Sequence, residues 1–259
     1  MPEGAEVRYL AELAKKYMVG HKFEHIVSNT KAVVKLPNPS KVVDVGSKGK
    51  IMWIETVDYI LFIHYGLTGW LLLENSKYPK YVFKFDNFDA FIDDSRRFSK
   101  LHVLKDKTKK VRFLSNLGVD ILSKDFTYNY MKNILRKRNA NICSVLMEQS
   151  LFAGIGNYIK NESLYIAKIS PYRRCNELSD KEIIKLYGAI RYVTYSNLAE
   201  MMRMIKRKLP VDLRNISPKQ ISVPYKFKVY GNDYDPLGNK VTIENVNGRA
   251  TYYVKKIQK

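Results

Sequence analysis

The chain has 259 residues, of which 46% are hydrophobic, enough for the cores of one large or two medium domains. Lysine and arginine number 45 against 25 aspartate and glutamate, and the formal net charge of +20 far exceeds what solubility requires. This charge predicts a polyanionic partner, with nucleic acid as the first candidate and an anionic membrane surface as the second.

Other features of the composition limit location and metal content. No apolar run approaches the length of a membrane span, and the N-terminus lacks the layout of a signal peptide, so we expect an intracellular protein that is not secreted. The two cysteines, Cys143 and Cys175, are too few for a disulfide framework or a zinc ribbon. We expect both to be reduced, structural thiols.

The first residues carry the first candidate chemistry. Removal of Met1 would leave Pro2 with a free secondary amine, and roughly a quarter of α-amines are unprotonated at about pH 7.5. Such an amine can attack a carbonyl-like carbon and form a Schiff base, while the adjacent Glu3 could donate and then recover a proton. An ordinary helix start explains the same residues. The rest of the chain must decide between the two interpretations.

Apolar residues at three- and four-residue spacing predict an amphipathic helix over residues 4 to 18, closed by Gly20. From about residue 22 to 104, short runs of β-branched and aromatic residues alternate with polar and glycine breaks. That pattern predicts a β-sandwich or a β-barrel.

Three turns within this β-rich region carry residues suited to DNA. Lys50 lies on a glycine-containing turn and could bind a phosphate, although a solvated hairpin is the simpler explanation of this turn alone. Leu67 occupies a loop tip after His64 and either packs under its loop or acts as a wedge between stacked bases. Arg96 and Phe98 share another loop, where a salt bridge beside a half-buried ring is the simpler explanation. Together these loops offer a wedge, a cation and an aromatic ring, which can fill a gap in a duplex.

The second half of the chain changes from strand to helix patterns. Residues 105 to 123 break both periodicities and predict an inter-domain linker with a boundary near 115. Helical spacing follows over 124–137, 141–149, 157–167, 179–191 and 193–207, which predicts an α-helical bundle. Within it, Gly154 and Gly156 allow close backbone approach, and Asn157 begins a helix whose N–H groups could bind a phosphate. A plain helix–helix turn is the alternative.

The last segment, from about 224 to 259, returns to strand composition. Two or three short strands with glycines at their turns predict a small hairpin module. Arg249 follows Gly248 on one of these turns and could reach a phosphate, or could be an ordinary surface arginine. A hairpin of this size has little core of its own, so other interactions must hold it.

Taken in order, these residues resemble the formamidopyrimidine-DNA glycosylase / endonuclease VIII family of base-excision repair enzymes. The resemblance runs nearly from end to end. It rests on matching segments at residues 2–4, the Lys50 turn, 64–69, 94–98, 154–158, 161–165, and 229–231 leading to 248–249.

The resemblance implies a catalytic set of Pro2, Glu3 and Lys50. Pro2 would attack C1′ of the damaged nucleotide, and Glu3 would act as the general acid that opens the sugar ring. Lys50 would hold a phosphate of the flipped nucleotide. A Schiff base would form after the base leaves, and successive β- and δ-elimination would cut the strand on both sides.

The resemblance also implies a set of DNA-binding residues. The phosphate-binding and gap-filling residues would be Asn157, Arg249, Leu67, Arg96 and Phe98, with Gly156 and His64 in the same motifs. The middle of the chain resembles the family's helix-two-turns-helix motif.

The C-terminal finger departs from the family pattern. Family members usually carry two Cys-x-x-Cys pairs there, whereas the matching positions in this chain are Leu237, Lys240, Val254 and Ile257. Without thiolates a zinc site is excluded, and packing must hold the hairpins, as in the zincless Nei-like members. We therefore expect neither a metal nor a cofactor.

The resulting prediction is an α+β multidomain protein. Residues 1–115 form an N-terminal helix with a catalytic β-sandwich, 116–223 a helix-two-turns-helix DNA-binding domain, and 224–259 a zincless β-hairpin finger. The expected partner is damaged double-stranded DNA, with single-stranded DNA as an alternative, and the expected state is a monomer without membrane contact. Its location would be wherever the DNA is kept, whether nucleus, nucleoid or viral factory.

We expect a bifunctional DNA glycosylase and AP lyase with a preference for oxidised pyrimidines, which rests on the zincless finger. An oxidised-purine glycosylase is an alternative. A non-catalytic binder of damaged DNA and a basic RNA-binding or ribosome-associated protein are alternatives from other classes. Neither binder has a use for a free N-terminal proline, so retention of Met1 would favour them.

Overall fold

A computed structural model describes residues 2–29, 34–74, 76–206 and 225–259. The chain divides into two compact units, Met1–Asn116 and Leu117–Lys259, and each is described by itself. The predicted division into three domains, 1–115, 116–223 and 224–259, remains a prediction, because the division into two units does not separate the finger from the helices.

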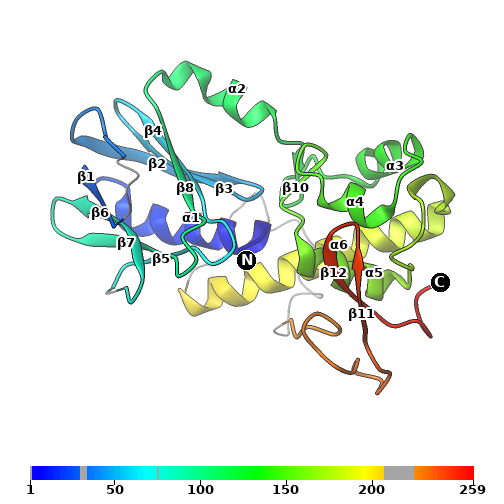
Figure 1. The fold of residues 1–259 in the computed structure, drawn as a ribbon. Helices are drawn as coiled ribbons and strands as arrows, with labels where there is room; N and C mark the ends of the chain where they lie inside the picture. The colour runs from blue at the N-terminus through cyan, green and yellow to red at the C-terminus, as the bar shows by residue number, and fades with distance from the viewer. Residues whose placement is uncertain (1, 30–33, 75, 207–224) are drawn as a thin grey trace. The chain divides into compact units, whose positions relative to one another are not determined.

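Helix α1 (Gly4–Met18) confirms the helix predicted over residues 4 to 18. A capping box between Glu3 and Glu6 begins it, and the Glu3 backbone N–H donates to Oε2 of Glu6 at 2.9 Å. Its apolar stripe, which includes Val7, Leu10 and Ala14, is completely buried. This face packs on strands β2 and β3, so the sheet fixes the start of the helix (Figure 1).

The strands of the first unit form one eight-stranded sheet in the order β5-β7-β6-β1-β2-β3-β4-β8. Their bounds are β1 (Lys22–Ser28), β2 (Ser40–Lys48), β3 (Ile51–Thr56), β4 (Ile60–His64), β5 (Trp70–Leu72), β6 (Pro79–Phe85), β7 (Asp89–Asp93) and β8 (Lys100–Leu104). Strands β1 and β2 pair through only two residue pairs, Lys22 with Lys41 and Phe23 with Ser40. This short junction joins the halves β5-β7-β6-β1 and β2-β3-β4-β8 and agrees with the predicted sandwich.

Residues 105 to 123, predicted to form an inter-domain linker, contain regular structure, and the division between the two compact units falls within them. A 3₁₀ turn η1 (Lys107–Lys109) leads into helix α2 (Lys110–Ser115), and β9 (Val119–Asp120) follows. The Asp106 side chain caps the turn by accepting from the backbone N–H of Thr108. Phe113 then stacks on Phe62 with ring centroids 4.1 Å apart, so a tertiary contact holds a helix of only six residues.

The second unit contains the other helices of the described residues. They are α3 (Tyr128–Arg136), α4 (Ile142–Met147), α5 (Asn157–Ala167) and α6 (Asp180–Met204), with the short strand β10 (Phe152–Ala153) and the 3₁₀ turn η2 (Cys175–Glu177). Helix α6 is continuous where the pattern predicted two segments, and a capping box between Ser179 and Glu182 begins it. Helix α5 is buried on nearly all sides and lies at the centre of this unit.

The two cysteines are buried and free, as predicted. Burial raises the pKa of Cys143 to about 11 and that of Cys175 to about 12. Both thiols are therefore protonated at neutral pH and act as small apolar side chains in the helical core.

The finger is a two-stranded hairpin of β11 (Thr242–Val246) and β12 (Arg249–Tyr253). Asn247 and Gly248 have φ of 51° and 76°, so the connection has the left-handed backbone of a tight Asn-Gly hairpin turn. Residues 227–230 have the composition of one of the two or three predicted strands, but they form bends that lead into a turn. The Glu162 carboxylate accepts the backbone N–H groups of this segment, which are therefore not available to a strand partner.

Packing and polar side chains both hold the finger. A small core contains Tyr165, Val229, Val241 and Val254, with Ile257 packed against it. This agrees with the expectation that aliphatic residues replace the zinc ligands, although Leu237 is 76% exposed and takes no part. The structure adds carboxylate and amide contacts that the sequence analysis did not foresee.

Asp235 is the main polar group of the first finger loop. Its Oδ1 accepts from the backbone N–H of Leu237 at 2.9 Å and of Asn239 at 2.7 Å, and its Oδ2 accepts from the Tyr165 hydroxyl at 3.0 Å. Gln258 has a similar role near the C-terminus: its Oε1 accepts from Val254 N at 2.8 Å. These side chains hold the two loops where the family pattern has paired cysteines.

Candidate functional site

The catalytic candidates lie at the start of α1. Pro2 and Glu3 are buried, with Glu3 only 2% exposed. The capping box with Glu6 fixes the backbone of Glu3, and the helix behind it is anchored on the sheet. A buried carboxylate on the residue that follows Pro2 suits a general acid and base, because the capped helix start fixes the backbone that carries it.

Lys50 and His64 lie together at one end of three neighbouring strands. Lys50 follows Gly49, whose φ of 57° forms the β2–β3 turn, and it precedes Ile51, which pairs with His64 across the β3–β4 ladder. His64 in turn pairs with Lys100 of β8. The predicted phosphate-binding turn therefore has a second lysine beside it, which the sequence analysis missed because only strand register brings it there.

The charges of this cluster determine the state of His64. Partial desolvation and the charges of Lys50 and Lys100 lower the pKa of the imidazole. The neutral form of the ring is therefore favoured, and its Nδ1 accepts the backbone N–H of Gly66 at 3.1 Å. The two lysines leave this edge positively charged, as a phosphate site requires.

The loops carrying Leu67 and Phe98 pack directly on each other. A Cβ atom placed on Gly66, whose φ is 67°, would lie 2.7 Å from the backbone carbon and the Cβ of Phe98. Thr68 Oγ1 donates to Asp94 Oδ1 at 2.5 Å and accepts from Arg96 N at 3.3 Å. The two sequence motifs are thus one structural element.

Gap-filling side chains project from this element. Leu67 is half-buried, and Phe98 is 47% exposed. The Arg96 guanidinium lies 4.9 Å from the centre of the Phe98 ring, a cation–π geometry that holds both side chains. The wedge, the cation and the aromatic ring predicted from separate loops are brought together.

Two buried charged residues support these loops, and the sequence analysis gave neither a role. Asp94 is fully buried and accepts from Ser99 N at 2.7 Å. Burial alone would raise the pKa of this carboxyl, but hydrogen bonds from Thr68 and Ser99 lower it below its usual value. Lys80 donates to the carbonyl oxygens of Arg97 and Ser99, both at 2.5 Å. The loops are therefore preorganised, which lowers the cost of binding.

In the second unit, Asn157 and Arg249 meet at the junction of α5 and the finger. Gly156 is the N-cap residue of α5, and the Nδ2 of Asn157 donates to the carbonyl of Ala250 at 2.9 Å. Arg249 is the exposed residue immediately before Ala250. Residues almost a hundred positions apart thus form one basic site at a helix N-terminus, an arrangement that binds phosphates.

A cavity of about 330 Å³ adjoins this junction. It is lined by Cys143, Ser144, Met147, Glu148, Lys160, Val246, Asn247 and Arg249. Its walls come from α4, α5 and the finger turn, all within the second unit.

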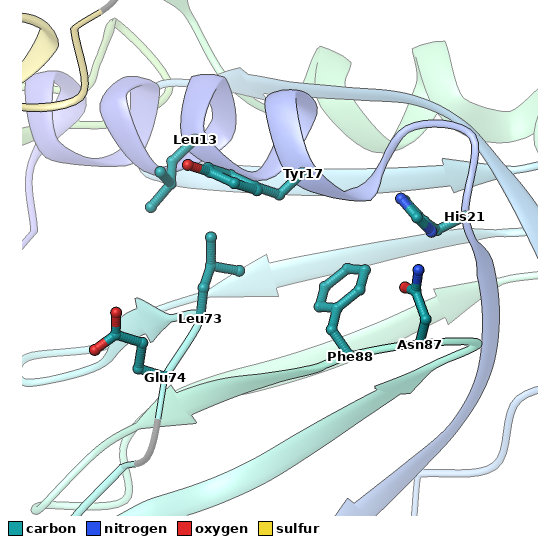
Figure 2. Close-up of a pocket in the computed structure, with 7 residues that line it drawn as sticks. All are labelled: Leu13, Tyr17, His21, Leu73, Glu74, Asn87 and Phe88. Carbon is teal, nitrogen blue, oxygen red and sulfur yellow. The ribbon is translucent and has the colours of Figure 1, made fainter.

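A second cavity, of about 510 Å³, lies in the first unit towards the C-terminal end of α1. Figure 2 shows Leu13 and Tyr17 of α1 and the nearby His21 facing Leu73, Glu74, Asn87 and Phe88. The His21 ring meets Phe88 edge to face at 5.3 Å and is hydrogen-bonded to Asp86 at 3.0 Å. None of the motif residues lines this cavity.

None of the helices in the described ranges has the length and apolarity needed to cross a membrane. Within the same ranges, His, Cys, Asp and Glu form no group of three or more suited to hold a metal ion.

Comparison with known families gives three matches in chain order. They are the formamidopyrimidine-DNA glycosylase N-terminal domain over residues 1–101, the H2TH domain over 117–208 and the C-terminal domain over 215–259.

Curated relatives match along the same length. The formamidopyrimidine-DNA glycosylase of Wolbachia sp. subsp. Brugia malayi is 30% identical over 82% of this chain and 79% of that protein. Those of Wolbachia pipientis subsp. Culex pipiens and Rickettsia conorii are 29% and 28% identical, covering 100% of this chain and 100% and 99% of theirs.

Solved structures share the fold. The MutM (Fpg) protein of Thermus thermophilus superposes with a TM-score of 0.82 at 24% identity, covering 99% of this chain and 98% of that one. Lactococcus lactis Fpg, bound to DNA containing an AP site, gives a TM-score of 0.82 at 21% identity, covering 99% of both chains. The chain, with its capped Pro2-Glu3 start, its helical unit and its hairpin, belongs to the formamidopyrimidine-DNA glycosylase family.

Proposed function

We propose that this protein is a DNA glycosylase and AP lyase of base-excision repair that acts on oxidised bases in double-stranded DNA. The observation that carries the proposal is the buried Pro2-Glu3 pair at the capped start of α1, in a chain of this family. The net charge of +20 supplies sequence-independent affinity for DNA, which suits a search for lesions.

The reaction begins once Met1 has been removed. The Pro2 nitrogen attacks C1′ of the damaged nucleotide, the glycosidic bond breaks, and the base leaves with the bonding electron pair. Glu3 protonates the ring oxygen, the sugar opens, and an iminium forms between Pro2 and C1′. Loss of a C2′ proton then expels the 3′ phosphate, and a further elimination expels the 5′ phosphate.

Access to C1′ requires that the nucleotide leaves the base stack, at a cost of a few kcal/mol. Leu67, Arg96 and Phe98 offset this cost by filling the space that the nucleotide vacates. Lys50 and Lys100 in the first unit, and Asn157 and Arg249 in the second, bind phosphates around the extruded nucleotide.

Two lesion classes are candidates. The relatives are named for formamidopyrimidines, which are ring-opened purines, and this is the class we propose first. The finger without thiolates favours oxidised pyrimidines, because it matches the zincless Nei-like pattern. Excision rates on matched duplexes that differ only in the lesion will rank the two classes.

Borohydride trapping tests the proposal. Wild-type protein with Met1 shown by mass spectrometry to be absent should form a covalent adduct with a duplex that contains an abasic site. Glu3→Gln should lose excision of an intact damaged base, whereas Glu24→Gln, the same change on β1, should keep it. Binding without any adduct would show instead a non-catalytic binder of damaged DNA.

A further inference from the structure

Lys160 is a fully buried lysine on α5, one helical turn after Asn157. Because side chains three residues apart share a helix face, both residues reach strand β12. Lys160 Nζ donates to Thr251 Oγ1 at 2.9 Å, and this hydroxyl donates to the Arg249 carbonyl at 3.1 Å. The buried ammonium is thus joined to the backbone of the exposed arginine.

The cavity beside this junction brings the two cations to one space. Lys160 and Arg249 both line it, and Glu148 is the one carboxylate among its described lining residues, an exposed group whose Oε1 accepts from Ser150 Oγ at 2.8 Å. Cys143 also lines it, and the nearby charge of Lys160 partly opposes the burial that raises the pKa of this thiol. The ammonium therefore acts electrostatically on the cavity wall.

Burying an ammonium is expensive, because it loses its hydration. An anion in the cavity would recover part of this energy. Among the described lining residues, the two cations Lys160 and Arg249 outnumber the one carboxylate of Glu148, so the cavity attracts anions. A phosphate oxygen accepts hydrogen bonds from both ammonium and guanidinium groups.

We propose that Lys160 is a second phosphate-binding residue, which draws the DNA phosphate contacted by Arg249 into the cavity between α4, α5 and the finger turn. This proposal rests on the proposed DNA-binding function. It assigns Lys160 a direct electrostatic role in addition to its support of β12.

The test uses the full chain and a duplex with a tetrahydrofuran abasic-site analogue, which the enzyme binds but cannot process. Affinity is measured over a series of salt concentrations for wild type, Lys160→Met, Arg249→Ala and the control Lys185→Met, an exposed lysine of α6. The same proteins are then measured on duplexes in which single phosphates are replaced by neutral methylphosphonates. Lys160→Gln, which can still donate to Thr251, is the second variant, and thermal unfolding checks each protein.

We expect Lys160→Met and Lys160→Gln to weaken binding by roughly 10- to 100-fold and to reduce the salt slope by up to about 0.9. At one methylphosphonate position, Lys160→Met and Arg249→Ala should bind the duplex as tightly as the wild type does, because the phosphate charge that both residues contact is gone. A penalty that persists on every methylphosphonate duplex, or an unchanged salt slope in both Lys160 variants, would show a purely structural role. Failure of the wild type to prefer the abasic duplex over an undamaged one would refute the proposed function itself.

Discussion

Replacement of Asp235 by asparagine tests how the finger is held without a metal. The carboxylate is 5% exposed and accepts from Leu237 N, from both nitrogens of Asn239 and from the Tyr165 hydroxyl. Hydrogen bonds to a charged group stabilise by about 1.5–3 kcal/mol, against about 0.5–1.5 for neutral pairs. Asparagine retains some of these contacts as weaker, neutral hydrogen bonds. Asp235→Asn should therefore lower the free energy of unfolding of the finger by roughly 2–3 kcal/mol, and Asp235→Ala should lower it by more.

Hydrogen–deuterium exchange gives the local readout. The amides of Leu237 and Asn239 should exchange faster by roughly 30- to 150-fold in Asp235→Asn, the factor that corresponds to about 2–3 kcal/mol. Asp233→Asn is the matched control, because it makes the same chemical change at an exposed position in the same loop. Unchanged exchange in Asp235→Asn would refute the assignment of this carboxylate as the organising group.

Acid titration provides a second measure of the same carboxylate. Burial raises the pKa of Asp235, but hydrogen bonds from Asn239, Tyr165 and Leu237 together lower this pKa by more than burial raises it, so the net shift is downward. A lowered folded pKa stabilises the protein above the unfolded value of about 3.9, and this stabilisation is lost as the pH falls through the folded pKa. Wild-type finger protection should therefore decline below about pH 4, and Asp235→Asn should lack this component.

Three further predictions concern other contacts. Phe98→Ala should slow excision from duplex DNA by roughly 5- to 150-fold, since stacking on one ring contributes about 1–3 kcal/mol, while an equal loss on single-stranded substrate would contradict a gap-filling role. Gly66→Ala should destabilise the first unit by about 1–3 kcal/mol in thermal unfolding, because φ is 67° and the new Cβ would meet the backbone of Phe98, and a wild-type Tm would disprove this. Glu162→Gln should lower the Tm by roughly 3–10 °C through weaker bonds to the N–H groups of residues 228–230, and it should do so without changing borohydride trapping at low temperature.

Local pattern was sufficient for much of the fold. The helix over residues 4 to 18 follows from apolar spacing and was found at those bounds, and the strand-rich region formed the expected sandwich. The motif residues were identifiable because a proline after Met1, a leucine at a loop tip and an arginine after an Asn-Gly turn are locally unusual. Helix α2, within the predicted linker, was not foreseen, because the contact that stabilises it stacks Phe113 on Phe62, a ring far away in the chain.

The sequence by itself therefore determined the periodic elements, the basic charge, the family motifs and the lack of thiolates in the finger. Only the tertiary structure decided which residues act together. Strand register put Lys100 beside His64, loop packing joined Gly66 to Phe98, and helix packing buried Lys160 against β12. Such contacts join positions far apart in the chain, and their energy comes from burial and hydrogen bonding after folding, so no local pattern records them.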